Sequence, residues 1–177
     1  RVNMIFEGTN EVLRLMIARA GLREPGRRLA EGIDSGSEYG RKASGAEAPE
    51  PMQVPAPLQT DALALSMGIA DLATDVVWAL NNHGRELGER QLVLSRLSEQ
   101  AVGLYARSAI LARARTRVEQ HGEEACAREL LLAQGACRRL ARRARERHTL
   151  LRANEDALIR HTAEAVNASV GLPTGRA

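Results

Sequence analysis

The amino-acid sequence predicts an all-α protein, an up-and-down helical bundle preceded by one further helical segment. Apolar side chains recur at intervals of three and four residues through most of the chain, and this spacing places them on one face of a helix. No stretch has the alternating pattern of a β-strand, and no internal repeat is visible. Short connections separate the apolar stripes, which makes consecutive helices pack antiparallel.

The first predicted helix runs from about Thr9 to Ala20. Thr9 and Asn10 are good N-cap residues, because their side-chain oxygens can accept hydrogen bonds from the first N–H groups of the helix. Gly21 is a plausible end for this helix, and residues 22–31 are predicted to add a short one. The apolar residues of the first helix are Val12, Leu13, Leu15, Met16 and Ile17.

Residues 34–57 differ in composition from the rest of the chain. They contain Pro49, Pro51, Pro55 and Pro57 together with repeated Ser, Gly and Glu, and few side chains that could be buried. Such a composition is typical of a mobile linker. The sequence is therefore predicted to divide into residues 1–31, a flexible linker over 32–57, and a helical domain over 58–177.

Four helices are predicted after the linker, each from an apolar stripe whose steps are three, four or seven residues. The stripes span residues 65–80, 87–111, 126–144 and 159–170. Gly84, Gly122 and Gly171 follow the first, second and fourth stripes, as expected of residues that end helices. The sequence has no unbroken run of 18 apolar residues, so we expect no membrane-spanning helix.

Composition restricts the classes of function. The formal net charge is +3 and nearly all basic residues are arginine, seven of them between Arg128 and Arg147. Glu129 and Glu146 interleave with these arginines, and no aromatic residue lies nearby to stack on bases. We therefore expect a solvated helix face or an interface and no nucleic-acid partner. An arginine-rich nucleic-acid binder is the alternative, and it predicts a steep salt dependence of binding.

The two cysteines and four histidines suggest no metal site. Cys126 and Cys137 are eleven residues apart, which puts them on one face of a straight helix but too far apart to form a disulfide with each other. The histidines have no ligand spacing, so no metal is expected. Two unpaired cysteines are typical of a reducing compartment.

Glu7 is the strongest candidate for chemistry. It lies just outside a helix N-terminus, between the apolar pair Ile5-Phe6 and Gly8, where a carboxylate in a partly dry pocket can act as a general base. The segment IFEGTNEVLRLMIARAGL resembles a loop and the helix that follows it near the end of the sequences of the acyl-CoA dehydrogenase family. The segment GERQLVLSRLSEQAVGLYARSAILARARTRV, Gly88 to Val118, resembles the extra C-terminal helical domain of its very-long-chain branch, which includes a complex I assembly factor.

The resemblance implies FAD-dependent oxidation of long-chain acyl-CoA to trans-2-enoyl-CoA, a step of fatty acid β-oxidation. It makes Glu7 the base that removes the α proton, while the N–H of Glu7 and a ribityl hydroxyl of FAD hold the thioester oxygen. Phe6 and Gly8 match substrate-binding positions. The positions that match FAD contacts are Thr9, Asn10, Glu11 and Gln91. Residues 1–31 then end the catalytic helical domain, and residues 58–177 form the extra domain.

The resemblance also implies partners and a location. Electron-transfer flavoprotein is the expected electron acceptor, and a homo-dimer or tetramer the expected assembly. Residues 22–57 lack the basic amphipathic pattern of an interfacial helix, so the sequence does not favour membrane attachment there. We expect a cytoplasmic protein if the source is bacterial and a mitochondrial one if eukaryotic. This chain alone is expected to be an inactive C-terminal piece. The alternative function is a non-catalytic assembly factor of the same fold.

Overall fold

The computed structural model describes residues 9–35 and 47–171, with the backbone alone for residues 29–35. Within these ranges the chain is helical and contains no strand, which confirms the predicted all-α class. The α-helices are α1 (Asn10–Ser35), α3 (Gln59–His83), α4 (Gln91–His121), α5 (Ala127–Arg152) and α6 (Asp156–Ser169). Two 3₁₀ turns, η2 (Ala56–Leu58) and η3 (Gly84–Glu89), precede α3 and α4.

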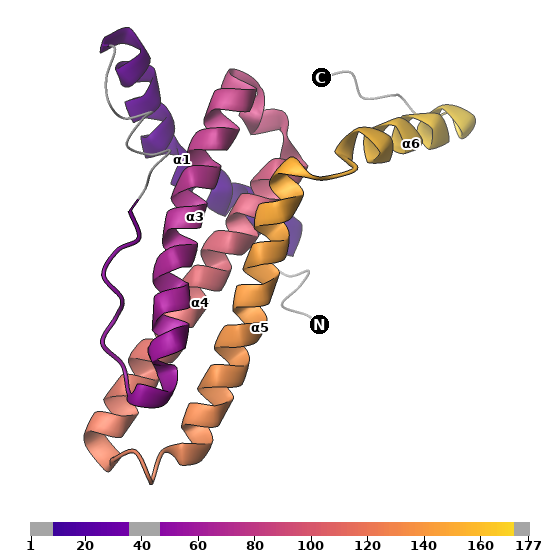
Figure 1. Ribbon diagram of the computed structural model, residues 1–177. Coiled ribbons are helices and arrows are strands. Elements are labelled where there is room, and N and C mark those ends of the chain that lie inside the picture. Colours follow the sequence, from indigo (N-terminus) through magenta and orange to yellow (C-terminus); the bar gives the residue numbers. More distant parts are fainter. Residues whose placement is uncertain (1–8, 36–46, 172–177) are drawn as a thin grey trace.

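Helices α3, α4 and α5 run up, down and up beside one another, as Figure 1 shows. Gly84 and Gly122 follow α3 and α4 with φ angles of +51° and +82°, backbone conformations that favour glycine. Gly171 has φ +69° just beyond α6. The three glycines that the sequence suggested as helix ends therefore do end helices.

The core consists of two clusters of buried apolar side chains. One lies where α3, α4 and α5 meet, and it includes Leu58, Leu111 and both cysteines. The other lies around the start of α4, where Leu94 and Leu151 are almost fully buried and Ala18 of α1 packs against them. Burying a leucine fully is worth about 1.5–3 kcal/mol, so the two clusters supply much of the stability of the bundle.

The predicted end of the first helix at Gly21 is wrong, because α1 continues through Gly21 and Pro25 to Ser35. Arg27 and Arg28 both donate hydrogen bonds to the Glu24 carboxylate one turn earlier, at 2.8 and 2.7 Å. Leu22 packs against the second core cluster. These contacts stabilise the helix on both sides of Pro25, and they outweigh the weak helix preference of glycine.

Part of the predicted linker packs against the bundle. Residues 47–55 form neither a helix nor a strand. The hydroxyl of Ser66 on α3 donates to the carbonyl of Pro49, and Met52 and Val54 pack against the first core cluster. The sequence predicted a mobile linker with few side chains to bury, and these contacts hold residues 49–54 against the bundle. The rest of the linker, residues 36–46, lies outside the described residues.

The fourth predicted bundle helix does not join the bundle. Helix α6 projects away from α3, α4 and α5 (Figure 1), and none of its residues is buried. Its start is held by a bidentate ion pair, in which Arg96 of α4 donates to both carboxylate oxygens of Asp156 at 2.7 and 2.5 Å. Helix α1 packs mainly against α4.

One stretch of the described chain, Ala56–Glu89, is long enough and apolar enough to cross a membrane by length and composition, with a mean hydropathy of 1.5. It differs from the sequence prediction because that prediction required an unbroken apolar run. In the structure α3 lies within this stretch, packs against α4 and α5, and holds the carboxylate of Asp75 in the core. A core helix of a bundle meets the same criteria.

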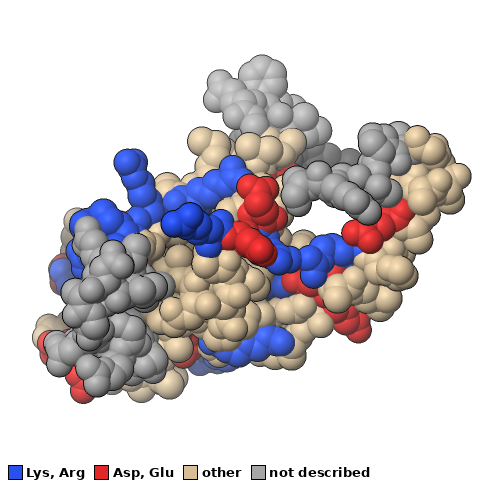
Figure 2. All heavy atoms as spheres, turned by 90° about the horizontal axis from the view of Figure 1, so that it is seen from above, with Lys and Arg blue, Asp and Glu red and all other residues tan. Residues whose placement is uncertain are grey.

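Acidic and basic side chains alternate over the surface seen in Figure 2. Glu99 of α4 pairs with Arg147 of α5 and with Arg14 of α1, and Glu129 pairs with Arg117 across the α4–α5 turn. Exposed pairs of this kind contribute little to stability. Within the arginine cluster of residues 128–147, Arg147 is paired in this way with Glu99 of α4. The interleaved Glu129 pairs instead with Arg117, which lies outside the cluster.

Candidate functional site

The predicted catalytic segment Phe6-Glu7-Gly8 lies outside the described residues, directly before the first of them. The described chain begins at Thr9, whose hydroxyl oxygen accepts a hydrogen bond from the N–H of Val12 at 3.4 Å. The Thr9 carbonyl accepts the first helical bond, from the N–H of Leu13 at 3.0 Å. Thr9 is therefore the N-cap of α1, and a helix N-terminus follows the predicted base, as the sequence suggested.

Asn10 and Glu11 form the first turn of α1, and the Glu11 side chain is exposed. An acidic residue in a first turn stabilises the helix through its dipole. The capping bond of Thr9 satisfies one of the N–H groups at this end, and the others remain able to donate to a ligand. Thr9, Asn10 and Glu11 thus lie at one helix end, where a polar or anionic group can bind.

Gln91 is the first residue of α4, and its side chain is exposed. No side chain caps this helix, because its N-cap residue is Arg90, whose guanidinium has no acceptor for a backbone N–H. The Gln91 amide can both donate and accept, and the first N–H groups of α4 have no intrahelical partner. This helix start is thus a second place for a polar ligand to bind.

The structure does not bring these two helix starts to one point. Arg14 of α1 pairs with Glu99 of α4 at 3.3 Å, and Arg19 donates to the carbonyl of Gly88 at 3.0 Å. From Arg14 to Arg19 along α1, the contacted residue changes from Glu99 back to Gly88, so the two segments run in opposite directions. Glu11 and Gln91 therefore lie on opposite sides of the Arg14–Glu99 pair. At 1.5 Å per residue, they are on the order of 15 Å apart along the helices.

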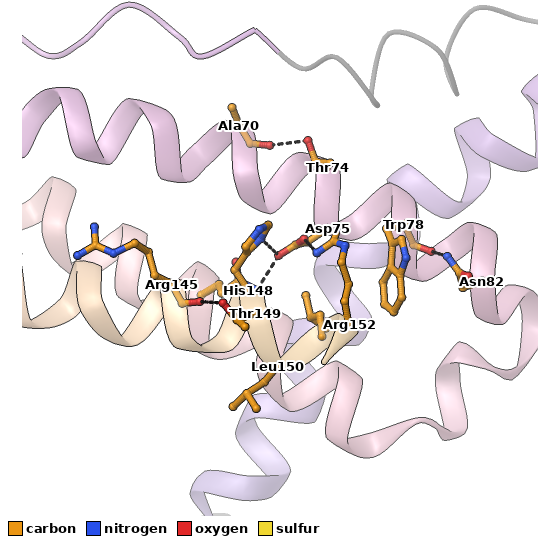
Figure 3. Close-up of polar contacts among 12 residues, drawn as sticks. Ala70, Thr74, Asp75, Trp78, Asn82, Arg145, His148, Thr149, Leu150 and Arg152 are labelled. Carbon is orange, nitrogen blue, oxygen red and sulfur yellow. Dashed lines mark hydrogen bonds and ion pairs between the residues drawn. The ribbon is translucent and has the colours of Figure 1, made fainter. Parts of the chain in front are cut away.

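A cluster of polar side chains that the sequence reasoning missed lies in the core (Figure 3). Asp75 of α3 is fully buried and accepts hydrogen bonds from three side chains. The donors are Gln100 Nε2 at 3.0 Å, His148 Nδ1 at 2.9 Å and Arg152 Nη1 at 2.6 Å. Arg152 also lies over the Trp78 ring, 5.0 Å from its centroid, at cation–π distance.

The Asp75 cluster ties three helices together, since its members come from α3, α4 and α5. A buried carboxylate is costly unless it is paired and hydrogen-bonded, and here one oxygen accepts from His148 and Gln100 while the other accepts from Arg152. We therefore assign the cluster a structural role. The sequence signal was an aspartate three residues after Leu72, on an apolar stripe. His148, which has no metal-ligand spacing in the sequence, serves here as a hydrogen-bond donor to Asp75.

No group of three or more His, Cys, Asp or Glu in residues 9–35 and 47–171 could hold a metal ion. Cys126 and Cys137 are both free and buried, and burial raises the pKa of the Cys137 thiol. A thiol with a raised pKa is a weak nucleophile. The two cysteines therefore act as small core side chains in the part of the chain that the structure describes.

Residues 56–171 match the model of the family described as "ACAD9/ACADV, C-terminal domain". Among curated proteins, the chain is 28% identical over 170 residues to the very long-chain specific acyl-CoA dehydrogenase, mitochondrial, of Bos taurus, covering 87% of this chain. It is also 28% identical over 169 residues to the Homo sapiens protein of the same name, covering 82% of this chain. The chain spans about a quarter of the length of these relatives, 26% and 25%.

A solved structure has the same fold. It is the crystal structure of an acyl-CoA dehydrogenase complexed with FAD from Bacillus anthracis, with a TM-score of 0.70 and 20% sequence identity. The similarity covers 92% of this chain and 27% of that one. Because the coverage exceeds the family match at the N-terminal side, α1 belongs to the shared fold as well as the bundle.

Proposed function

Because the chain belongs to the family defined by the C-terminal domain of ACAD9 and ACADV, we propose that it is the C-terminal part of an FAD-dependent acyl-CoA dehydrogenase. The reaction is the oxidation of long-chain acyl-CoA to trans-2-enoyl-CoA. The observation that supports this most is the order of two matches, Glu7-Gly8-Thr9-Asn10 first and the family domain over 56–171 after it. The chain spans 26% of the bovine relative, so turnover requires the remaining domains.

Glu7 is the proposed base. It removes the α proton of the thioester, and its own N–H donates to the thioester oxygen on which negative charge develops. Phe6 and Gly8 border the acyl group, and a glycine permits close approach of the backbone. Expulsion of water by an apolar substrate raises the pKa of a carboxylate toward the range in which it is an effective base. FAD, when bound, accepts the hydride from the β carbon.

The described residues fit a long polar cofactor. Thr9, Asn10 and Glu11 at the start of α1 and Gln91 at the start of α4 lie at two separate helix ends. A dinucleotide is long enough to contact both, with its phosphates or ribityl hydroxyls at helix N-termini. Arg14 pairs with Glu99 of α4, and Arg19 donates to the carbonyl of Gly88 in η3 just before α4. These two contacts fix the position of α1 relative to α4.

The proposed partners follow from the same function. Acyl-CoA is the substrate, electron-transfer flavoprotein the electron acceptor, and a homo-dimer or tetramer the assembly. The mammalian relatives are named as mitochondrial proteins, which favours mitochondria for a eukaryotic source. A cytoplasmic location for a bacterial source stays a prediction. Incubating the complete polypeptide with a saturated long-chain acyl-CoA and an electron acceptor tests the reaction directly. The expected product is lighter than the substrate by two hydrogen atoms.

A non-catalytic interaction role is the second candidate function, and α6 is the observation that favours it. Leu158, Ile159 and Val166 of α6 are 60%, 51% and 55% exposed and lie along one helix face. An amphipathic helix normally buries its apolar face against a partner. An assembly factor would retain this face and lose the reaction, so the product assay above separates the two functions.

Replacing Gln91 by Ala in the complete polypeptide should weaken FAD binding and leave the fold intact, because alanine preserves helix propensity and removes only the amide. Equilibrium dialysis of FAD measures the first effect, and the melting temperature measures the second. Gln59→Ala is the matched control, since Gln59 is also an exposed first residue of a helix, α3. Equal FAD affinity in the Gln91 and Gln59 variants would show that Gln91 does not contact the cofactor.

A further inference from the structure

A cavity of about 110 Å³ lies between α3, α4 and α5. Small residues form part of its walls, Ala64 and Gly68 on α3 and Ala141 and Ala144 on α5. The larger apolar side chains in its lining are Met67 and Leu104, and the polar ones include Gln100 and the guanidinium groups of Arg107 and Arg145. The cavity therefore combines an apolar part with a basic part, and Arg107 is the deeply buried member of the basic part.

Arg107 is only 1% exposed, yet its guanidinium is incompletely bonded. Nη2 donates to the carbonyl of Asp61 at 3.3 Å, and Nε has no hydrogen-bond partner. The Oδ2 atom of the Asp61 carboxylate is also buried without a partner, so the two side chains do not satisfy each other. Five N–H donors in a buried guanidinium require acceptors, and none of the described carboxylates is hydrogen-bonded to it.

The electrostatics of the cavity favour an added negative charge. Burial lowers the pKa of Arg107, and the nearby charge of Arg145 lowers it further, against the opposing effects of Cys137 and Asp61. Arg145 and His148 also line the cavity, with Asp71 as the acidic residue among its lining groups. A buried cation is stabilised by a hydrogen-bonded anion, and a carboxylate matches the planar fork of a guanidinium.

Gly68 leaves the space that this arrangement requires. A β carbon at position 68 would lie 2.9 Å from Leu104 Cδ2 and 3.5 Å from Arg107 Nη1. A side chain at this position would therefore press on Leu104 and would also come into contact with the guanidinium of Arg107. The absence of a side chain at Gly68 and the methyl groups of Ala64, Ala141 and Ala144 thus keep the cavity open beside Arg107.

We propose that this cavity binds a short-chain monocarboxylate, with its carboxylate on the Arg107 guanidinium and its hydrocarbon tail against Ala64, Ala141 and Ala144. We infer a hydrocarbon tail because the alanine side chains of the wall can contact apolar carbon atoms but cannot donate hydrogen bonds to a hydrated anion such as inorganic phosphate. We infer a short tail because a cavity of about 110 Å³ holds a ligand of a few carbon atoms. The helices that form the site are those of the family domain, and the inference is independent of the proposed role of Glu7.

Titration of the chain with butyrate, followed by the NMR signals of the ligand, tests the proposal. For a ligand of six heavy atoms we expect a Kd on the order of 1 mM. Arg107→Met should weaken butyrate binding at least tenfold, and replacing a buried ion by an apolar side chain of similar volume usually preserves the fold. Arg139→Met is the matched control, because Arg139 is exposed on α5 and does not line the cavity.

A second variant keeps the test decisive if Arg107→Met does not fold. Ala144→Leu fills the cavity with a good helix former and leaves the guanidinium in place, and it should abolish butyrate binding. Equal butyrate affinity in the original chain and in Ala144→Leu, or in the Arg107 and Arg139 variants, would overturn the proposal. Inorganic phosphate binding as tightly as butyrate would overturn it as well, since the apolar walls would then contribute nothing.

Discussion

Glu7→Gln in the complete polypeptide should nearly abolish proton abstraction from acyl-CoA. Glutamine keeps the shape of the side chain and the backbone N–H, so the substrate should still bind, while the proton acceptor is gone. A positioned acid or base typically contributes about 10²–10⁴-fold to a rate, and we expect a loss of at least this size in the rate of flavin reduction. Rapid mixing with a saturated acyl-CoA in the absence of oxygen measures that rate.

Glu24→Gln is the control, because it removes a carboxylate from α1, the helix that follows the Glu7 motif. Glu24 lies on α1, and the hydrogen bonds that Arg27 and Arg28 donate hold its pKa at about 2. A carboxylate with so low a pKa is a weak base at neutral pH, so this variant should reduce its flavin at the parent rate. If Glu7→Gln reduced its flavin as fast as Glu24→Gln, the proton acceptor would be another residue.

Asp75→Ala should destabilise the bundle by about 3–5 kcal/mol, the usual cost of removing one partner of a buried ion pair. The change removes three hydrogen bonds to a buried carboxylate, one of them from an arginine, and bonds to charged groups are worth about 1.5–3 kcal/mol each. Gln100, which is 2% exposed, would be left buried without its acceptor. Urea unfolding followed by circular dichroism gives the free energy of unfolding, and the midpoint should fall while the slope stays constant.

Asp71→Ala is the matched control, because Asp71 lies one turn before Asp75 on α3 and is exposed. A surface substitution of this kind usually changes stability by less than about 0.5 kcal/mol. Equal unfolding free energies for the Asp71 and Asp75 variants would show that the buried cluster does not hold the three helices together.

The bundle could be predicted from sequence because its signals are local. The apolar stripes of α3, α4 and α5 and the glycines after α3 and α4 depend only on residues near them in the chain. The continuation of α1 through Gly21 could not be predicted this way. Leu22 packs against a cluster formed by α3, α4 and α5, and tertiary packing of this kind outweighs local propensity.

The positions of α6 and of residues 47–55 also depend on tertiary contacts, which local sequence signals do not show. The apolar stripe of α6 predicts a helix correctly, but a stripe does not say which partner covers it, and none of the residues of α6 is buried against the described chain. For residues 47–55, composition indicated a mobile linker, and two apolar side chains, Met52 and Val54, together with the Ser66 hydrogen bond were enough to place them on the bundle.

In the candidate site and the core, some residues also carry local sequence signals, whereas others have partners far away along the chain. The roles of Glu7 and Gln91 could be proposed because each lies in a short segment of sequence that resembles the family, and both roles stay predictions. Arg107 and Asp75 could not be assigned a role, because their partners lie 46 or more and 25 or more residues away along the chain. A polar residue on an apolar stripe was the one signal available, and its partner is visible only in the fold.

Anaerobic addition of a saturated long-chain acyl-CoA to the complete, flavin-loaded polypeptide tests the central claim most directly. A dehydrogenase transfers two electrons from the substrate to its flavin, so the yellow absorbance of oxidised FAD should disappear in proportion to the acyl-CoA added, and an enoyl-CoA should form in equal amount. A flavin that stays oxidised while acyl-CoA binds would contradict the proposed reaction. It would leave the family fold as the scaffold of an interaction protein.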